Sequence, residues 1–200
     1  MNDSVINNDQ AFLEALRMGD KKAFAILVET NSEAIYRVAL RMLNDPEDAE
    51  DILQETFIKA YRSLPNFEGR SQLSTWLYRI AVNEALMMIR KRKLDTISID
   101  QDYETDEGDF IPQQIVDWCC LPEKELINNE SRQQISWAIK KLSPSNRAVF
   151  ILRDLSGLST RDTAEVLDIS EAAVKTRLLR SRLEMREHLS SYYAGRIAAT

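Results

Sequence analysis

The chain has 200 residues, a length that allows one or two small domains with modest cores. Its net charge is −6. Five glycines and five prolines among many Leu, Ala, Glu and Arg residues favour an all-helical protein. We find no long apolar run and no signal peptide, so we expect a cytoplasmic protein that does not insert into a membrane.

The charge is distributed unevenly along the chain. Residues 1–94 carry −1, residues 95–130 carry −10, and residues 131–200 carry +5. Residues 95–122 also lack helical periodicity. We therefore predict a helical domain over residues 1–94, an acidic flexible linker over residues 95–122 and a second helical domain over residues 123–194.

Residue types that commonly carry out chemistry are sparse. Cys119 and Cys120 are adjacent, which suits neither a disulfide framework nor a zinc site; reduced thiols are expected, with a redox role as the alternative. His188 is the single histidine, and no cysteine or carboxylate cluster accompanies it. We expect no enzymatic activity, cofactor, metal or small-molecule substrate.

Apolar residues at helical spacing predict the helices of the first domain. Two short helices lie within residues 9–31, interrupted at Gly19, and a third ends near Leu43. Asp45 and Pro46 have the residue types that cap and begin a fourth helix. A loop over about residues 64–71 and a long helix over about residues 72–93 complete this domain.

The fourth helix carries an acidic side next to its apolar stripe. Asp48, Asp51 and Glu55 are spaced i, i+3 and i+7, with Gln54 nearby. The helix dipole alone accounts for an acid in the first turn, as at Asp48. Asp51 and Glu55 lie further along the helix and offer a carboxylate row to a basic partner.

The loop and long helix have a second notable composition. Tyr78, Arg79 and Asn83 lie away from the main apolar stripe, and Phe67 lies in the loop. Rings on which bases stack and cations that follow phosphates are typical of a single-stranded nucleic acid site. Ordinary core aromatics are an equally good interpretation of the same pattern.

The second domain begins with a helix over about residues 123–142. Ser143 caps the next helix, which leaves Arg147 and Arg153 available on its outside. Two short helices follow, the first capped by Ser159 or Thr160 and the second by Ser170.

The last of these helices is strongly basic. Its cations fall within twelve residues: Lys175, Arg177, Arg180, Arg182 and Arg186. Two short helices joined by a tight turn, the second of them basic, predict a helix-turn-helix that places this helix in the major groove of DNA. A solvated helix face is the alternative interpretation.

Four segments together resemble bacterial sigma factors of the extracytoplasmic-function (ECF) class. They are DAEDILQETFIKAYRSLPNFEG (48–69), STWLYRIAVNEA (74–85), LSPSNRAVFILRDLSGLS (142–159) and ISEAAVKTRLLRSRLEMREHL (169–189). The resemblance implies a region 2 domain and a region 4 domain. It also implies a protein that binds core RNA polymerase, directs initiation at promoter DNA and is controlled by an anti-sigma factor.

The resemblance assigns a role to each surface. Asp48, Asp51, Gln54 and Glu55 match the segment that docks on the polymerase β′ clamp helices, and region 4 is expected to meet the β flap. The residues implied for opening and reading the −10 element are Phe67, Arg70, Trp76, Tyr78, Arg79 and Asn83. Those implied for the −35 element are Arg153, Arg161, Glu171, Lys175, Thr176, Arg177, Leu179, Arg180 and Arg182. Among the latter, Lys175, Thr176 and Leu179 are best placed for base edges.

The long helix departs from the family pattern in two places. Val82 stands where many members have a basic residue, and Met87-Met88 stand where a polar residue is common. These residues reduce contact with the DNA backbone or leave an apolar patch for a partner. The competing hypothesis for the whole chain is a stand-alone helix-turn-helix transcription factor that binds duplex DNA without polymerase.

Overall fold

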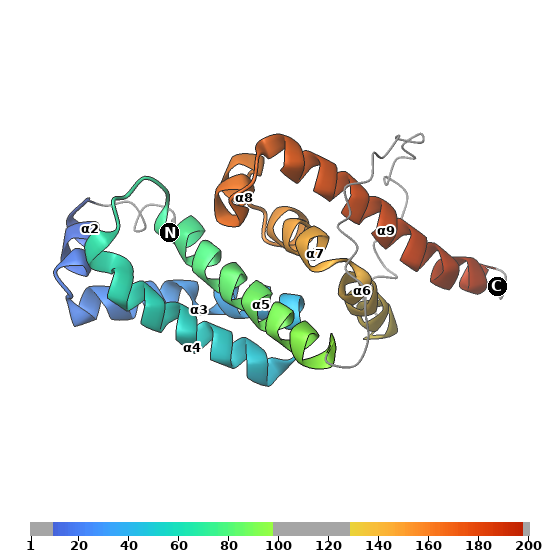
Figure 1. The fold of residues 1–200 in the computed structure, drawn as a ribbon, viewed down its shortest axis with the longest axis horizontal. Coiled ribbons are helices and arrows are strands. Elements are labelled where there is room, and N and C mark those ends of the chain that lie inside the picture. The colour runs from blue at the N-terminus through green and yellow to red at the C-terminus, as the bar shows by residue number, and fades with distance from the viewer. Residues whose placement is uncertain (1–9, 98–128, 198–200) are drawn as a thin grey trace.

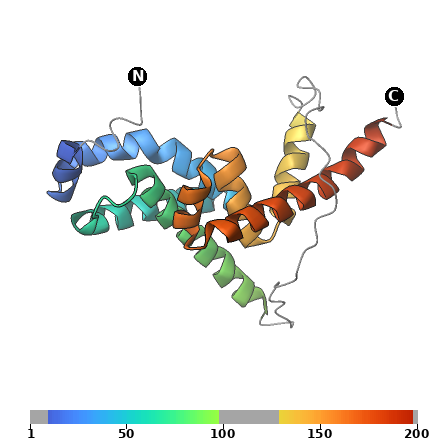
Figure 2. The same ribbon diagram turned by 90° about the horizontal axis from the view of Figure 1, so that it is seen from above.

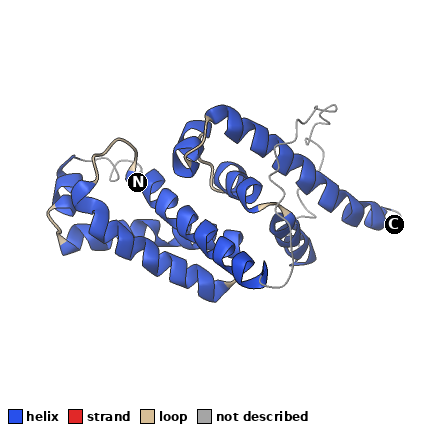
Figure 3. Ribbon diagram, in the orientation of Figure 1, coloured by secondary structure: helices blue, strands red, loops and turns tan. Residues whose placement is uncertain are grey.

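The computed structural model describes residues 10–97 and 129–197, and all regular secondary structure within these ranges is helical (Figure 3). The helices are α2 (Gln10–Arg17), α3 (Lys21–Leu43), α4 (Pro46–Ser63), η1 (Leu64–Asn66), α5 (Leu73–Ile97), α6 (Asn129–Lys141), α7 (Pro144–Phe150), η2 (Ile151–Leu155), α8 (Thr160–Leu167) and α9 (Glu171–Ile197). The all-helical prediction is confirmed for these residues. The predicted acidic linker and Cys119-Cys120 lie outside them.

Helices α2 to α5 form an N-terminal unit in which α3, α4 and α5 pack against one another (Figure 1). Their apolar stripes meet in one core that includes Leu27, Ile52 and Leu77. The predicted start of α4 is confirmed, because the Asp45 side chain accepts hydrogen bonds from the main-chain N–H groups of Glu47 and Asp48. None of the described helices has the length and apolar character needed to cross a membrane.

One prediction for this unit is wrong: the second and third predicted helices are a single helix, α3. The polar run Thr30-Asn31-Ser32 lies in its interior. Each of these side chains donates a hydrogen bond to the main-chain carbonyl four residues earlier, at 2.8, 2.8 and 2.5 Å. Side-chain donors are thereby satisfied within the helix, which removes the usual reason for a chain to leave it at such residues.

Helices α6 to α9 form the C-terminal unit, in which the long α9 packs against α6, α7 and α8 (Figure 1). The predicted caps are confirmed: Ser143 accepts from the N–H of Asn146, Ser159 from Asp162 and Ser170 from Ala173. The predicted exposure of Arg147 is wrong. Its side chain is half-buried, and its guanidinium donates to main-chain carbonyls, because those at the C-terminal end of α6 lack partners within the helix.

The two units share a second hydrophobic core. Val38 and Met42 of α3 and Val82 of α5 are buried in it together with residues of α6, α7, η2, α8 and α9. Consistent with this, α8 lies beside α5 in both views (Figures 1 and 2). Helix α5, which carries predicted readers of the −10 element, and α8, the first helix of the predicted helix-turn-helix, therefore lie against each other in this structure.

Candidate nucleic-acid and polymerase interface

The acidic side of α4 is only partly free. Asp51 and Gln54 are exposed, whereas Glu55 is half-buried and lies 3.5 Å from the Nζ of Lys59. The same Nζ lies 2.6 Å from the Oε1 of Glu84 on α5. These two contacts hold the cation beside Glu55, and the hydrogen bond to Glu84 is the main cause of a raised pKa at Lys59.

Asp48 occupies a different environment from the rest of this row. It is buried, with 9% of its surface exposed, and its carboxylate forms an ion pair with Arg92 near the end of α5. Its second carboxylate oxygen, Oδ2, has no hydrogen-bond partner among the described residues. The structure thus places Asp48 between two helices and leaves Asp51, Gln54 and part of Glu55 on the surface.

The loop before α5 is held by aromatic packing. Phe67 and Trp76 are 8% and 7% exposed, and their ring centroids lie 4.8 Å apart. Arg17 of α2 donates from its Nε to the carbonyl oxygen of Phe67 at 2.8 Å. Gly69 then adopts a φ of 76°, which favours glycine. These two aromatic residues pack against each other and hold the loop in this structure, and their role in base stacking stays a prediction.

The remaining −10 candidates lie on or near the surface. Arg79 and Asn83 are exposed on one side of α5, and Arg70 is exposed in the loop, where it pairs with Glu68. Tyr78 is half-buried, and its burial raises its pKa, partly offset by the nearby cations Arg37 and Arg41. The surface of α5 therefore offers guanidinium and amide groups, with one aromatic ring at its edge.

Helices α8 and α9 form the predicted helix-turn-helix. Asp168 ends α8 with a φ of 53°, and Ser170 caps the start of α9 after a turn of three residues, 168–170. On these helices Arg161, Glu171, Lys175 and Thr176 are exposed. Arg177, Leu179 and Arg180 are half-buried along the same stretch of α9. The start of α9 therefore presents the side chains that a recognition helix requires.

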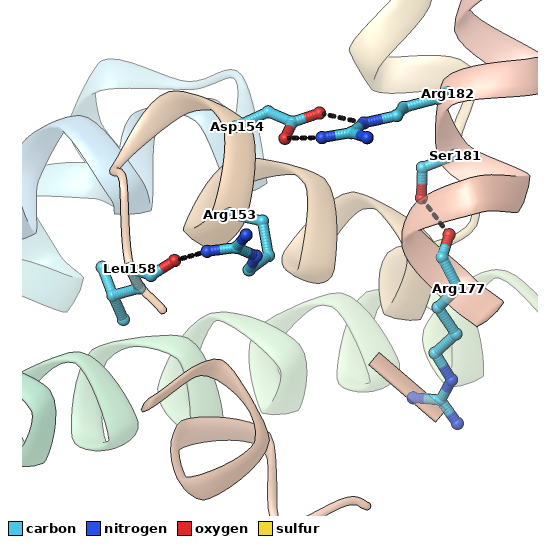
Figure 4. A network of polar contacts seen from close by, with 6 residues as sticks. All are labelled: Arg153, Asp154, Leu158, Arg177, Ser181 and Arg182. Atoms are coloured by element: carbon cyan, nitrogen blue, oxygen red, sulfur yellow. Dashed lines mark hydrogen bonds and ion pairs between the residues drawn. The ribbon is translucent and has the colours of Figure 1, made fainter. Parts of the chain in front are cut away.

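Two of the predicted phosphate contacts, Arg153 and Arg182, bond to partners within the C-terminal unit (Figure 4). Arg153 donates to the carbonyl oxygen of Leu158, just before α8, and its Nε is buried without a partner among the described residues. Arg182 forms two hydrogen bonds to the carboxylate of Asp154, at 2.7 and 2.9 Å. The bond to Asp154 raises the pKa of Arg182 and fixes the direction of its guanidinium.

Sequence reasoning did not find the partners that organise these surfaces. Five side chains join segments that lie apart in the chain or interact across a turn: Lys59, Glu84, Arg92, Arg147 and Asp154. Arg92 and Asp48, for example, are 44 residues apart. Helical spacing relates residues three or four apart on one helix, so it carries no signal for such pairs.

Comparison with known proteins gives a match for each of the two helical units. Residues 27–94 match the family model "Sigma-70 region 2", and residues 132–185 match "Sigma-70, region 4". The ECF RNA polymerase sigma factor SigW of Bacillus subtilis is 37% identical, covering 88% of this chain and 94% of that protein. The RNA polymerase sigma-H factor of Pseudomonas aeruginosa is 36% identical, covering 87% and 90%.

Solved structures extend the similarity to the fold. The sigma factor RpoE of Bartonella quintana, solved with the anti-sigma factor NepR, has a TM-score of 0.62 at 27% identity and covers 86% of this chain and 97% of that one. CnrH, solved with the cytosolic domain of CnrY, has a TM-score of 0.67 at 22% identity, covering 92% and 99%.

Both halves of the chain are thus those of a transcription initiation factor, in the expected order. The chain belongs to the sigma-70 family of RNA polymerase sigma factors, within its ECF class, as the matched segments predicted.

Proposed function

We propose that this protein binds core RNA polymerase in the cytoplasm and directs initiation at specific promoters, without catalysing a reaction itself. The observation that carries this proposal is the combination in one chain of an exposed acidic helix side and a basic helix-turn-helix, each within a matched sigma region. A stand-alone DNA-binding regulator has no need of the acidic helix side.

The N-terminal unit is proposed to bind the β′ clamp helices and the −10 element. Asp51, Gln54 and Glu55 contact the clamp, while Asp48 supports them from beneath. Arg79 and Asn83 of α5 and Arg70 of the loop contact the opened strand, with Tyr78 at the edge. Phe67 and Trp76 hold the loop in place. Unstacking a base costs a few kcal/mol, which stacking and phosphate contacts offset.

The C-terminal unit is proposed to read the −35 element and to contact the β flap. Lys175, Thr176 and Leu179 reach base edges from the start of α9, and Glu171 lies beside them. Arg161, Arg177 and Arg180 hold phosphates, which position the helix without specifying sequence. Arg153 and Arg182 support this surface through their contacts inside the unit.

An anti-sigma factor is the proposed regulator of this protein. The RpoE structure that resembles it was solved with such a partner. The packing of the C-terminal unit against α3 and α5 supports a single regulator that contacts both units.

In vitro transcription with bacterial core polymerase and a promoter-fragment library tests the proposal. Promoter-specific transcripts are expected only when both proteins are present. Tight duplex binding by the protein alone, without transcripts, would favour the stand-alone regulator instead.

The clamp assignment has its own test. The double substitution Asp51→Lys and Glu55→Lys should weaken core-polymerase binding about tenfold, because it reverses two charges at a rim position. The double substitution Glu14→Lys and Glu29→Lys, at exposed acids of α2 and α3, reverses the same number of charges and should bind as the wild type does. Fluorescence anisotropy with labelled protein measures both affinities, and equal affinities for all three proteins would remove the assignment.

A further inference from the structure

The loop before α5 receives a hydrogen bond from a helix far away in the chain. The Nε of Arg17, at the end of α2, donates to the carbonyl oxygen of Phe67 at 2.8 Å, across 50 positions of sequence. The bond is partly buried and its donor is charged, which makes it stronger than a bond between neutral groups. Arg17 thereby ties the main chain of the loop to α2.

The loop has little regular structure that would fix it without this contact. Residues 67–72 belong to no helix, and Gly69 turns the chain at a φ of 76°. A Cβ atom added at Gly69 would lie 3.7 Å from the Nη2 of Arg17 and 3.9 Å from the Cδ1 of Leu13. Side chains of α2 therefore reach the loop at Gly69 as well as at Phe67.

Apolar packing supports the same contact. Leu16 of α2, Phe67 and Trp76 are 2%, 8% and 7% exposed and belong to one core. Leu13 of α2 packs against that core with a partly buried side chain. Burial of these side chains holds α2 on the loop, whereas the directional bond from Arg17 sets where the main chain of the loop lies.

Helix α2 lies outside the segment that matches sigma-70 region 2. The match covers residues 27–94, and α2 ends at Arg17. In the fold, α2 lies at the end of the N-terminal unit where α4 passes into the loop (Figure 1). The exposed Arg70, a candidate for reading the −10 element, directly follows Gly69. A contact from outside the matched segment therefore acts on the part of the loop that carries this candidate.

We propose that Arg17 is a positioning residue for promoter reading, which holds the main chain of residues 67–72 so that Arg70 meets the opened −10 strand in one fixed geometry. The proposal rests on the proposed sigma function. A loop that is ordered before binding loses less conformational freedom when the strand arrives. A loop that moves can also adjust to an incorrect base. Loss of the Arg17 bond should therefore reduce discrimination between bases more than affinity for the strand.

The test uses the full chain in a Trp118→Phe/Trp137→Phe background, in which Trp76 is the single tryptophan. Acrylamide quenching of Trp76 reports the loop, because the Phe67 ring packs against it with 4.8 Å between the centroids. Holoenzyme affinity for non-template −10 strands of a library-selected promoter, intact or changed at one base, reports discrimination. Arg17→Gln should raise quenching about twofold and lower the affinity ratio about fivefold, with core-polymerase affinity unchanged.

Three further variants complete the comparison. Lys21→Gln removes the same charge from an exposed position at the start of α3 and should change neither value. Arg17→Lys keeps a charged donor and should recover most of the affinity ratio. If Arg17→Gln does not fold by circular dichroism, Gly69→Ala strains the loop itself at its positive φ and should give the same two changes.

The outcomes are separable. Wild-type quenching in Arg17→Gln would overturn the positioning of the loop, and raised quenching with an unchanged affinity ratio would overturn its role in −10 reading. An equal loss of affinity for all strands would also overturn that role, since it indicates a phosphate contact by Arg17 instead. Absence of transcripts with the wild-type protein would overturn the sigma function, while quenching of Trp76 still decides the loop contact.

Discussion

Asp48 differs in environment from the other acidic side chains of α4. It lies in the first turn of α4, where the helix dipole favours an acid, but it is buried. Arg92 reaches it from the far end of α5, and the side chain of Arg92 remains about half exposed. The pair therefore fastens the start of α4 to the end of α5, beneath the exposed Asp51.

Removing Arg92 should destabilise the protein without changing the clamp surface. Arg92→Met leaves a buried carboxylate without its cation, so we expect the free energy of unfolding to fall by about 1–2 kcal/mol. Arg90→Met, at an exposed position on α5, is the control. In urea titrations, the double variant Asp48→Asn/Arg92→Met should recover part of the loss, and strictly additive effects would show that the two residues do not interact.

At the scale of the element, the two faces of α9 carry different tasks. Val174 and Leu178 are buried against α7 and α8, while Lys175 and Thr176 are exposed at its start. A side chain near the start of a recognition helix reaches base edges, whereas cations further along meet the backbone. Sequence preference and general affinity should therefore respond to different substitutions on one helix.

Substitutions along α9 should separate these two contributions. Lys175→Ala or Thr176→Ala should change preference at the −35 element, at about 1–3 kcal/mol for the affected base pair. Arg180→Ala should lower affinity for all sequences and reduce the salt slope by about one. Holoenzyme binding to a −35 library at several salt concentrations measures both effects. If Arg180→Ala changed only base preference, the division into base-contacting and phosphate-contacting residues would be wrong.

Asp154 connects η2 to α9, and its removal should change the salt dependence of DNA binding. Its two hydrogen bonds hold Arg182 within the unit. Asp154→Ala removes an acid and releases a guanidinium, so the salt slope of DNA binding should increase by about one. Glu187→Ala removes an equal charge from an exposed position further along α9 and is the control. An identical slope in both variants would show that Arg182 does not reach DNA when released.

The elements also show what the sequence could and could not predict. Capping residues act within three residues of themselves, so Asp45, Ser143, Ser159 and Ser170 correctly marked helix starts. The continuity of α3 was missed because its polar run satisfies its own donors. The hydrogen bond of Arg147 to Met42 and the burial of Phe67 and Trp76 depend on tertiary partners, which periodicity does not specify.

For the whole molecule, the shared core couples two units that belong to different sigma regions. Val38, Met42 and Val82 from one unit are as fully buried as the residues of either separate core. Each unit also has apolar packing of its own, around Leu77 in the first and around Val149 and Val174 in the second. The units therefore retain separate cores but are stabilised by each other.

This coupling should be visible in unfolding. Of the three tryptophans, Trp76 lies in the N-terminal core, so a Trp118→Phe/Trp137→Phe background makes its fluorescence specific to that unit. Far-UV circular dichroism reports helices of both units. In this background the two signals should give one common urea midpoint, because opening either unit exposes the shared face.

Val82→Glu in the same background should separate the two midpoints. It removes a buried valine and places a charge in the contact, which weakens the coupling by about 2–3 kcal/mol. With urea slopes of about 1–3 kcal/mol per molar, the midpoints should then differ by about 1 M. Met87→Glu should keep them together, since its side chain lies outside the shared core. Coincident midpoints in Val82→Glu would mean that contacts other than this face hold the two units in one cooperative structure.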